Sequence, residues 1–199
     1  MFTLQEIIRA TGGSCAAGKM NAAARRISID SRTMARGDIF VAIKGGNFDG
    51  HQFIDQAIKQ GASAVLFQQG RYRPSRKNGP ACIKVKHTTR ALGDIALFHR
   101  RRFNIPVIAV TGSNGKTTTK EMIAWLLSGQ FRVLKNPGTK NNHIGVPLTL
   151  LELNQGHDLV ILEIGTNHFG EVAYLAGVCE PNIGVITNIG PSHLSSLRI

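Results

Sequence analysis

The sequence predicts an α/β protein of two units, the second of which is built on a parallel sheet. Short apolar segments alternate with amphipathic segments of helical length along the chain. The segment 105–110 is apolar throughout, which is typical of a parallel strand that is buried on both faces. A glycine-rich turn follows this strand directly and leads into a segment with helical periodicity.

The first unit begins with a helix. Thr3 and Glu6 have the spacing of a capping box, an apolar stripe follows, and Gly12-Gly13 ends the helix. A second helix is predicted from about His51 to Gly61. Strands are predicted at residues 27–29, 38–43, 64–67 and 81–85, and a basic loop at residues 70–80. We expect residues 1–87 to form this small α/β unit.

The second unit is predicted to run from residue 88 to 199. Residues 89–102 have a helical pattern, and the buried strand 105–110 follows. Further strands are predicted at residues 131–134, 159–164 and 183–187, with helices between them. This alternation predicts a doubly wound parallel sheet.

Composition excludes several classes of protein. With 42% hydrophobic and 18% charged residues, the chain is not intrinsically disordered. No apolar run approaches the ~20 residues of a membrane span, and the N-terminus lacks the pattern of a signal peptide. The three cysteines are widely spaced and odd in number, so we expect no disulfide framework. A cytoplasmic protein is therefore expected.

The chain is strongly basic, with a net charge of +12. Much of the excess lies in residues 71–102, which contain a single acid, Asp94. This segment shows no recognisable nucleic-acid-binding motif, so we expect a solvated basic face and no nucleic-acid partner. The alternative is a polyanion-binding face, whose binding would depend steeply on salt.

The glycine-rich turn has the features of a phosphate loop. Glycines allow backbone N–H groups to surround phosphate oxygens, and the following helix presents its positive N-terminus. Lys116 is placed to reach terminal phosphates, and the Thr117 hydroxyl to bind Mg²⁺. The commonest phosphate-loop pattern has glycine where this chain has Val110, and the alternative is a turn with a surface lysine. The predicted loop comprises Thr111, Gly112, Ser113, Asn114, Gly115, Lys116, Thr117 and Thr118.

Two further residues are expected at the same edge of the sheet. Glu163 follows the apolar run 159–162 at the end of its strand, and His193 follows the strand 183–187. The carboxyl ends of parallel strands face the crevice where ligands bind, so Glu163 is a candidate Mg²⁺ ligand. The alternatives are a structural carboxylate at 163 and an ordinary loop histidine at 193.

Polar clusters outside the loop suggest further contacts. The segment Asn141–Pro147 precedes a helix, and its asparagines are candidates for either capping or binding. In the first unit, Ser31 and Arg32, together with the turn Asp49-Gly50-His51, offer groups suited to a phosphate or carboxylate. Helix caps and turns are the alternative explanation for all of them.

Together these motifs resemble the ATP-dependent Mur ligases of peptidoglycan synthesis. The resemblance rests on residues 30–33, 37–42, 49–51 and 111–119, and it covers the chain from about residue 3 to 194. Residues 141–151, 163–171 and 186–190 resemble the branch that joins D-alanyl-D-alanine to UDP-N-acetylmuramoyl-tripeptide. The alternative within the family is a ligase for a different amino acid.

The resemblance implies a role for each candidate residue. Residues 1–87 would be a small N-terminal α/β substrate domain, which binds the UDP-muramoyl peptide through Ser31, Arg32, Asp49, Gly50 and His51. The phosphate loop and Asn142 would bind ATP. Lys116, Glu163 and His193 would be catalytic, and Thr117, Glu163 and His193 would hold Mg²⁺. The reaction would pass through an acyl phosphate.

The resemblance also implies that residues 88–199 form a truncated P-loop-type parallel-sheet ATPase domain. Members of the family continue well beyond this point, and they carry an acidic residue and glycines where this chain reads Ser195-Ser196-Leu197-Arg198-Ile199. We therefore expect the 199-residue chain to be unable to ligate by itself; the alternative role is a non-catalytic nucleotide-binding remnant. The third residue of the tripeptide, lysine or diaminopimelate, is left open.

Overall fold

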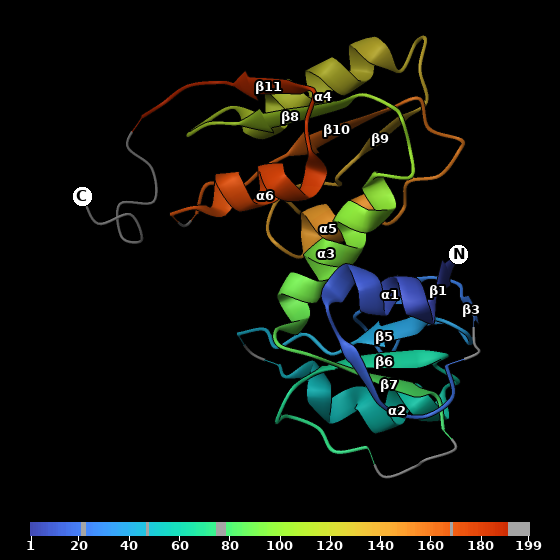
Figure 1. The fold of residues 1–199 in the computed structure, drawn as a ribbon. Coiled ribbons are helices and arrows are strands. Elements are labelled where there is room, and N and C mark those ends of the chain that lie inside the picture. The colour runs from blue at the N-terminus through green and yellow to red at the C-terminus, as the bar shows by residue number, and fades with distance from the viewer. Residues whose placement is uncertain (21–22, 47, 75–78, 168, 191–199) are drawn as a thin grey trace. The chain divides into compact units, whose positions relative to one another are not determined.

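The computed structural model describes residues 1–20, 23–46, 48–74, 79–167 and 169–190. The chain divides into two compact units, residues 1–95 and residues 96–199 (Figure 1). The division falls inside helix α3 (Thr88–Arg100). Within the described ranges, none of the helices combines the length and the apolar character that crossing a membrane requires.

The first unit contains a five-stranded sheet in the order β2-β7-β6-β5-β4. The pairs β4–β5, β5–β6 and β6–β7 are parallel, whereas β2 is antiparallel to β7. Two short strands, β1 and β3, pair antiparallel beside it. The bounds are β1 (Phe2–Thr3), β2 (Ser14–Ala17), β3 (Ala23–Ala24), β4 (Ile27–Ser28), β5 (Ile39–Val41), β6 (Ala64–Gln68) and β7 (Ala81–Val85).

The helices of this unit largely follow the predictions. Helix α1 (Leu4–Thr11) begins with the predicted capping box, in which Thr3 Oγ1 accepts from Glu6 N and Thr3 N donates to Glu6 Oε2. The second predicted helix is split into a 3₁₀ turn, η1 (Gly50–Phe53), and α2 (Ile54–Lys59).

Strand β2 was not predicted, because its sequence, SCAA, lacks the alternating β-branched residues that mark a strand.

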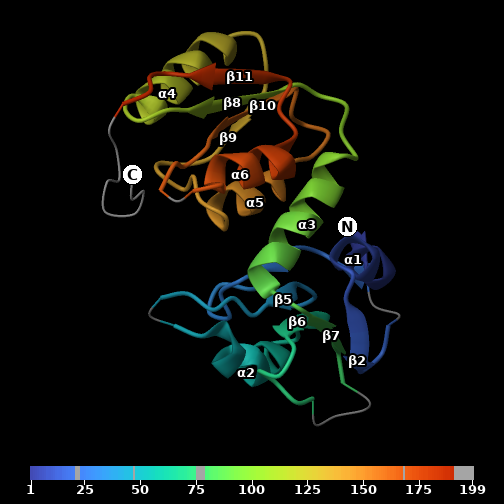
Figure 2. The same cartoon turned by 60° about the vertical axis from the view of Figure 1, so that its left-hand side comes forward.

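The second unit contains a four-stranded, fully parallel sheet in the order β11-β8-β10-β9. This confirms the parallel sheet expected from the sequence. Its strands are β8 (Val107–Thr111), β9 (Val133–Lys135), β10 (Leu159–Glu163) and β11 (Ile183–Ile186), and its helices are α4 (Lys116–Leu127), α5 (Gly145–Leu150) and α6 (Glu171–Cys179). Helix α4 lies on one face of the sheet, and α5 and α6 lie on the other (Figures 1 and 2).

Alternate residues of β10 are buried in two different apolar clusters. Val160 and Leu162 belong to the cluster that also contains Leu150 of α5 and Leu175 of α6. Ile161 belongs to the cluster on the α4 face. Strand β10 is therefore buried on both faces, which is why its sequence is apolar without alternation. Only its last residue, Glu163, is ionisable.

The connections place a crevice between β8 and β10. The chain leaves β8 through α4 on one face, and it leaves β10 through α6 on the other (Figure 2). Connections that part to opposite faces leave an opening outside the carboxyl ends of the two strands, and this is where open α/β sheets bind ligands. Residues that follow Thr111, and Glu163 with residues that follow it, line a cavity at this point.

Buried Arg100 ties three segments of the second unit together. Its guanidinium donates to the carbonyl oxygens of Cys179 at 3.2 Å, Phe103 at 2.7 Å and Ile105 at 3.1 Å. The Arg100 guanidinium therefore joins the end of α3, the end of α6 and the segment leading into β8. Backbone carbonyl groups accept from its N–H donors.

We predict that Arg100→Lys lowers the free energy of unfolding of the second unit by about 1–3 kcal/mol, because an ammonium cannot reproduce the three-way geometry of the guanidinium. Urea denaturation followed by circular dichroism measures this change. The matched control is Arg101→Lys, which alters an exposed pair with Glu180 and should have a much smaller effect. Equal losses in the two variants would contradict the prediction.

Candidate active site

The predicted phosphate loop connects the end of β8 to the start of α4. Gly112 has a φ of +131°, and a Cβ there would lie 2.3 Å from Thr187 Oγ1 and 2.9 Å from the carbonyl oxygen of Asn188. Any side chain at this position would be strained and would collide with the segment after β11. The glycine is thus required by both the backbone conformation and the close approach of the two segments.

The segment after β11 holds the loop in place. Asn188 accepts from Ser113 N through its carbonyl oxygen at 3.1 Å and from Asn114 N through Oδ1 at 2.9 Å. The Thr187 hydroxyl donates to the carbonyl oxygen of Asn114 at 2.6 Å. These bonds fix the loop from a neighbouring strand, so its conformation does not depend on the loop sequence alone.

Lys116 is the first residue of α4 and is half-buried. Its ammonium donates to the carbonyl oxygens of Gly112 at 2.7 Å and Ser113 at 3.2 Å. The side chain therefore lies along the loop. In this position its positive charge adds to that of the helix N-terminus.

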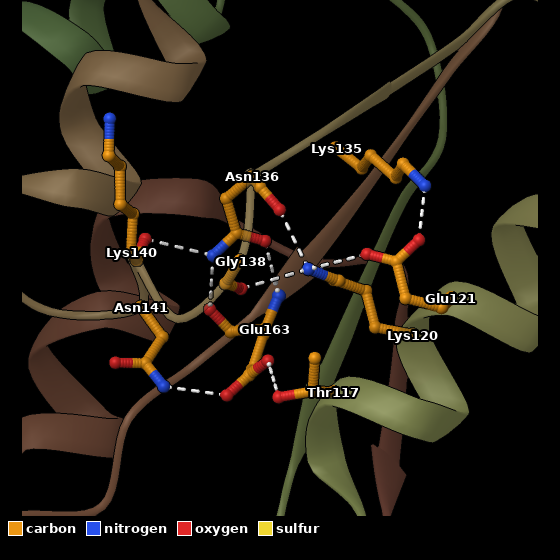
Figure 3. A network of polar contacts seen from close by, with 9 residues as sticks. All are labelled: Thr117, Lys120, Glu121, Lys135, Asn136, Gly138, Lys140, Asn141 and Glu163. Carbon is orange, nitrogen blue, oxygen red and sulfur yellow. Dashed lines mark hydrogen bonds and ion pairs between the residues drawn. The ribbon is translucent and has the colours of Figure 1, made fainter.

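Glu163 is 1% exposed, and both of its carboxylate oxygens are engaged by neutral groups. The Thr117 hydroxyl donates to Oε2 at 2.7 Å, and the Asn141 amide donates to Oε1 at 2.6 Å (Figure 3). In the described part of the chain Glu163 forms no ion pair. Because a buried carboxylate without a cationic partner is costly, this arrangement suits a bound cation.

The oxygen donors at this point fit Mg²⁺. Thr117 Oγ1 and Glu163 Oε2 are hard ligands that share one small space, and Mg²⁺ is commonly held by one or two protein oxygens together with phosphates. Over the described ranges, no cluster of three or more His, Cys, Asp or Glu side chains is arranged to bind a metal ion. His193, the third predicted ligand, lies outside the described residues.

A polar cavity of about 390 Å³ joins these groups. Besides loop residues and Glu163, it is lined by Asn141, which the sequence offered as a candidate for capping or binding, and by residues that were not predicted, among them Thr166. The Thr166 hydroxyl is buried and has no hydrogen-bond partner in the part of the chain that the structure describes. The cavity lining is Ser113, Asn114, Gly115, Lys116, Thr117, Thr118, Thr139, Asn141, Glu163, Thr166 and Asn167.

The two neighbouring asparagines have different positions. Asn142 Oδ1 accepts from Ile144 N at 3.0 Å and Gly145 N at 2.9 Å, so its side chain caps the start of α5. Asn141, rather than Asn142, contacts Glu163. The sequence indicated that the two adjacent asparagines were candidates, but it did not show which of the two amides faces the cavity.

A second cavity, of about 450 Å³, lies in the first unit. Arg32 at its edge forms a bidentate pair with Asp30, with Nε–Oδ1 at 3.0 Å and Nη2–Oδ2 at 2.7 Å. Hydrogen bonds from Arg32 lower the pKa of Asp30 to about 2. The residues around the cavity are Ile29, Asp30, Ser31, Arg32, Phe40, Ile43, Phe48, Gly50 and Phe53. Ser31, Arg32 and Gly50 were predicted, whereas the aromatic residues were not.

In the turn Asp49-Gly50-His51, the two polar side chains bond to each other and to strand β6. Gln68 N donates to His51 Nε2 at 3.0 Å, so Nδ1 carries the proton and donates to Asp49 Oδ1 at 2.5 Å. Burial alone would raise the pKa of Asp49, but the hydrogen bonds from His51 outweigh it and lower the pKa. A Cβ on Gly50 would lie 2.8 Å from Ile43 N, and of these three residues only Gly50 lines the cavity.

Two family models match this chain. The model described as Mur ligase middle domain matches residues 110–198, and the model described as Mur ligase family, catalytic domain, matches residues 24–100. The first match contains the phosphate loop and Glu163. The second contains Ser31, Arg32 and the turn at residues 49–51.

Curated relatives named UDP-N-acetylmuramoyl-tripeptide–D-alanyl-D-alanine ligase are similar over most of the chain. The Synechocystis protein is 46% identical over 173 residues, and the Bacillus subtilis protein is 42% identical over 171 residues. Each match covers 86% of this chain and 37% of the relative. The chain thus spans little more than a third of the length of these relatives.

Solved structures agree with these matches. The chain superposes on MurF from Acinetobacter baumannii with a TM-score of 0.89 and 36% identity, over 97% of this chain and 42% of that one. It also matches the MurF ligase from Thermotoga maritima in complex with ADP, with a TM-score of 0.77 and 36% identity, over 86% of this chain and 39% of that one. With family models and relatives covering both units, the chain belongs to the Mur ligase family.

Proposed function

We propose that this chain supplies the nucleotide-binding and muramoyl-peptide-binding parts of an ATP-dependent ligase that joins D-alanyl-D-alanine to UDP-N-acetylmuramoyl-tripeptide. The observation that carries the proposal is the contact between Thr117 and Glu163 at the mouth of the phosphate loop. The names of its relatives support the choice of substrates. We place the reaction in the cytoplasm.

The polar cavity of the second unit would take ATP. Backbone N–H groups at the N-terminus of α4 would face the phosphate oxygens of a nucleotide in this cavity, and Lys116 would add a full positive charge. The Thermotoga maritima relative was solved with ADP, which supports this assignment. Asn142 is retained as a candidate ATP contact through its amide nitrogen, because its Oδ1 is used in the cap.

Mg²⁺ would be held by Thr117 and Glu163, with His193 as a further proposed ligand. When bound, Mg²⁺ supplies positive charge that offsets the charge of the phosphates. In the reaction, the terminal carboxylate of the tripeptide attacks the γ-phosphoryl group and ADP leaves. Lys116 neutralises charge as the two anions approach each other. The amine of D-alanyl-D-alanine then attacks the acyl phosphate, and phosphate leaves.

The cavity of the first unit would take the UDP part of the muramoyl peptide. Phe48 and Phe53 offer exposed aromatic surfaces for a base, and Arg32 offers a guanidinium for a diphosphate. Ser31 lines the same cavity, and its hydroxyl donates to Gln56 Oε1 at 3.4 Å. Asp49 and His51 would contribute indirectly, by fixing the turn that contains Gly50.

Nucleotide binding separates the proposed roles of Lys116 and Glu163. We predict that Lys116→Ala lowers the affinity of the 199-residue chain for a non-hydrolysable ATP analogue about tenfold or more, both in Mg²⁺ and in EDTA. Glu163→Gln should lower the affinity only in Mg²⁺, because its role is to hold the cation. Calorimetric titration checks both predictions, with Lys44→Ala in the first unit as a control. Equal losses for Glu163→Gln in Mg²⁺ and EDTA would contradict its role.

Binding of the UDP-linked substrate tests the first unit. We predict that Arg32→Ala weakens binding of UDP-N-acetylmuramoyl-tripeptide about tenfold, because the guanidinium would no longer pair with the diphosphate. Arg36→Ala removes a nearby exposed arginine that does not line the cavity, and it should bind like the unchanged chain. If the two variants bind equally well, the assignment of the cavity is wrong.

Ligation is tested in a hybrid in which residues 1–190 replace the corresponding part of the Bacillus subtilis relative. We predict phosphate release that requires ATP, UDP-N-acetylmuramoyl-tripeptide and D-alanyl-D-alanine together. Lys116→Ala should reduce the rate by about 10²–10³, the typical cost of removing a charge-stabilising group. Turnover of UDP-N-acetylmuramoyl-dipeptide instead would favour a different amino acid ligase. A folded hybrid that binds ATP without turnover would favour the non-catalytic alternative.

A further inference from the structure

The side chain of Asn136 continues the β9–β10 ladder after the backbone of β9 has left it. The backbone register of this pair ends with Lys135 opposite Ile161. Beyond this point, Asn136 Oδ1 accepts from Glu163 N at 2.9 Å, and Asn136 Nδ2 donates to the carbonyl oxygen of Glu163 at 3.0 Å. The buried amide thus takes the place of a backbone peptide, and it satisfies both main-chain groups of Glu163.

The same amide also holds the loop that follows β9. Asn136 Nδ2 donates a second hydrogen bond to the carbonyl oxygen of Lys140 at 2.9 Å. The amide of the next residue, Asn141, donates to Glu163 Oε1 at 2.6 Å (Figure 3). The carbonyl oxygen of Asn141 accepts from Gly165 N at 2.8 Å. The side chain of Asn136 therefore positions both the backbone of Glu163 and Asn141, the residue that bonds to the Glu163 carboxylate.

Lys120 connects this arrangement to the phosphate-loop helix. It is fully buried, and it lies one helical turn after Thr117 on α4. Its ammonium donates to the carbonyl oxygens of Asn136 at 2.7 Å and Gly138 at 3.1 Å, and it pairs with Glu121 at 3.1 Å (Figure 3). A buried ammonium requires such partners, so Lys120 ties helix α4 to the loop that follows β9.

An amide suits position 136 better than other side chains of similar size. Leucine would fill the volume, but it would leave the buried N–H and C=O of Glu163 without partners. Aspartate would keep an acceptor for Glu163 N, but it would lose the donors to the carbonyl oxygens of Glu163 and Lys140. Aspartate would also place a second carboxylate near that of Glu163. Only the amide meets both the donor and acceptor requirements without adding charge.

We propose that Asn136 is a positioning residue that acts through Glu163, keeping the carboxylate at the Thr117 hydroxyl, where the Mg²⁺ of the bound nucleotide would be held. This inference rests on the proposed function for the identity of the ligand. Without the amide, the end of β10 loses two of its main-chain hydrogen bonds, and the loop carrying Asn141 loses one. The carboxylate would then no longer be fixed against Thr117.

The test compares Asn136→Ala with Asn182→Ala in the 199-residue chain. Asn182 Oδ1 accepts from Val107 N at 2.9 Å, so its loss removes a similar amide-to-strand bond at the opposite end of the sheet. We expect Asn136→Ala to weaken binding of an ATP analogue about tenfold in Mg²⁺ and less than about twofold in EDTA. Asn182→Ala should change neither affinity. Asn136→Ser serves as a milder variant if the alanine variant does not fold.

A double-mutant cycle asks whether Asn136 acts through Glu163. In the Glu163→Gln background, Asn136→Ala should cause no further loss of Mg²⁺-dependent affinity, because the group that it positions is already neutral. Additive losses would overturn the proposal, and so would equal losses in Mg²⁺ and EDTA. Either result would assign Asn136 a general structural role.

A spectroscopic measurement separates this proposal from the proposed function. In chain labelled with ¹³C-glutamate, the carboxyl signal of Glu163 is assigned by its absence in Glu163→Gln. We expect Asn136→Ala to shift or broaden this signal and Asn182→Ala to leave it unchanged. If the unchanged chain does not bind ATP, the proposed function fails while this measurement still decides the positioning role. A Glu163 signal unaffected by Asn136→Ala overturns the proposal.

Discussion

The contact between the Thr117 hydroxyl and the Glu163 carboxylate depends on the pairing of β8 with β10. Glu163 lies opposite Val110, so the end of one strand is level with the start of the phosphate loop on the other. Because successive side chains of a strand point to opposite faces, a shift of one residue would turn Glu163 away from this position. The register of two buried strands therefore determines whether the oxygen donors for a cation meet at all.

Apolar burial fixes the register, and polar groups then complete the site at the end of the sheet. Val160 and Leu162 pack on one face of β10 and Ile161 on the other, so the strand has few alternative positions. On the face that α4 covers, this apolar packing gives way to the carboxylate at Glu163, while the backbone remains buried. Its N–H and C=O groups still require partners, and these come from the amide of Asn136. The polar network of Figure 3 thus begins where strand pairing by backbone ends.

The sequence predicted those parts of the site that depend on local pattern. Gly112 and Lys116 follow from a glycine-rich turn between a buried strand and a helix, and Glu163 follows from its place at a strand end. Asn136 and Lys120 could not be predicted in the same way, because their roles depend on tertiary hydrogen bonds. A lysine within a helix is usually exposed, and nothing nearby in the sequence shows that Lys120 meets the carbonyl groups of a loop sixteen residues away. The edge strand β2 was not predicted, because it forms through hydrogen bonds to β7 and its own sequence shows no strand pattern.

The bonds within the site differ in how readily ligands can replace them. The loop backbone is held by main-chain and amide groups of Asn188, whereas the charges of Lys116 and Glu163 are satisfied by neutral carbonyl, hydroxyl and amide groups in the described part of the chain. A phosphate or a cation forms stronger interactions with these charges than neutral groups do, so the exchange favours binding while the backbone stays in place. Arg32 differs, because it already pairs with the carboxylate of Asp30. A diphosphate bound as proposed would have to compete with that pair, so its binding would draw as well on the aromatic and apolar lining of the cavity.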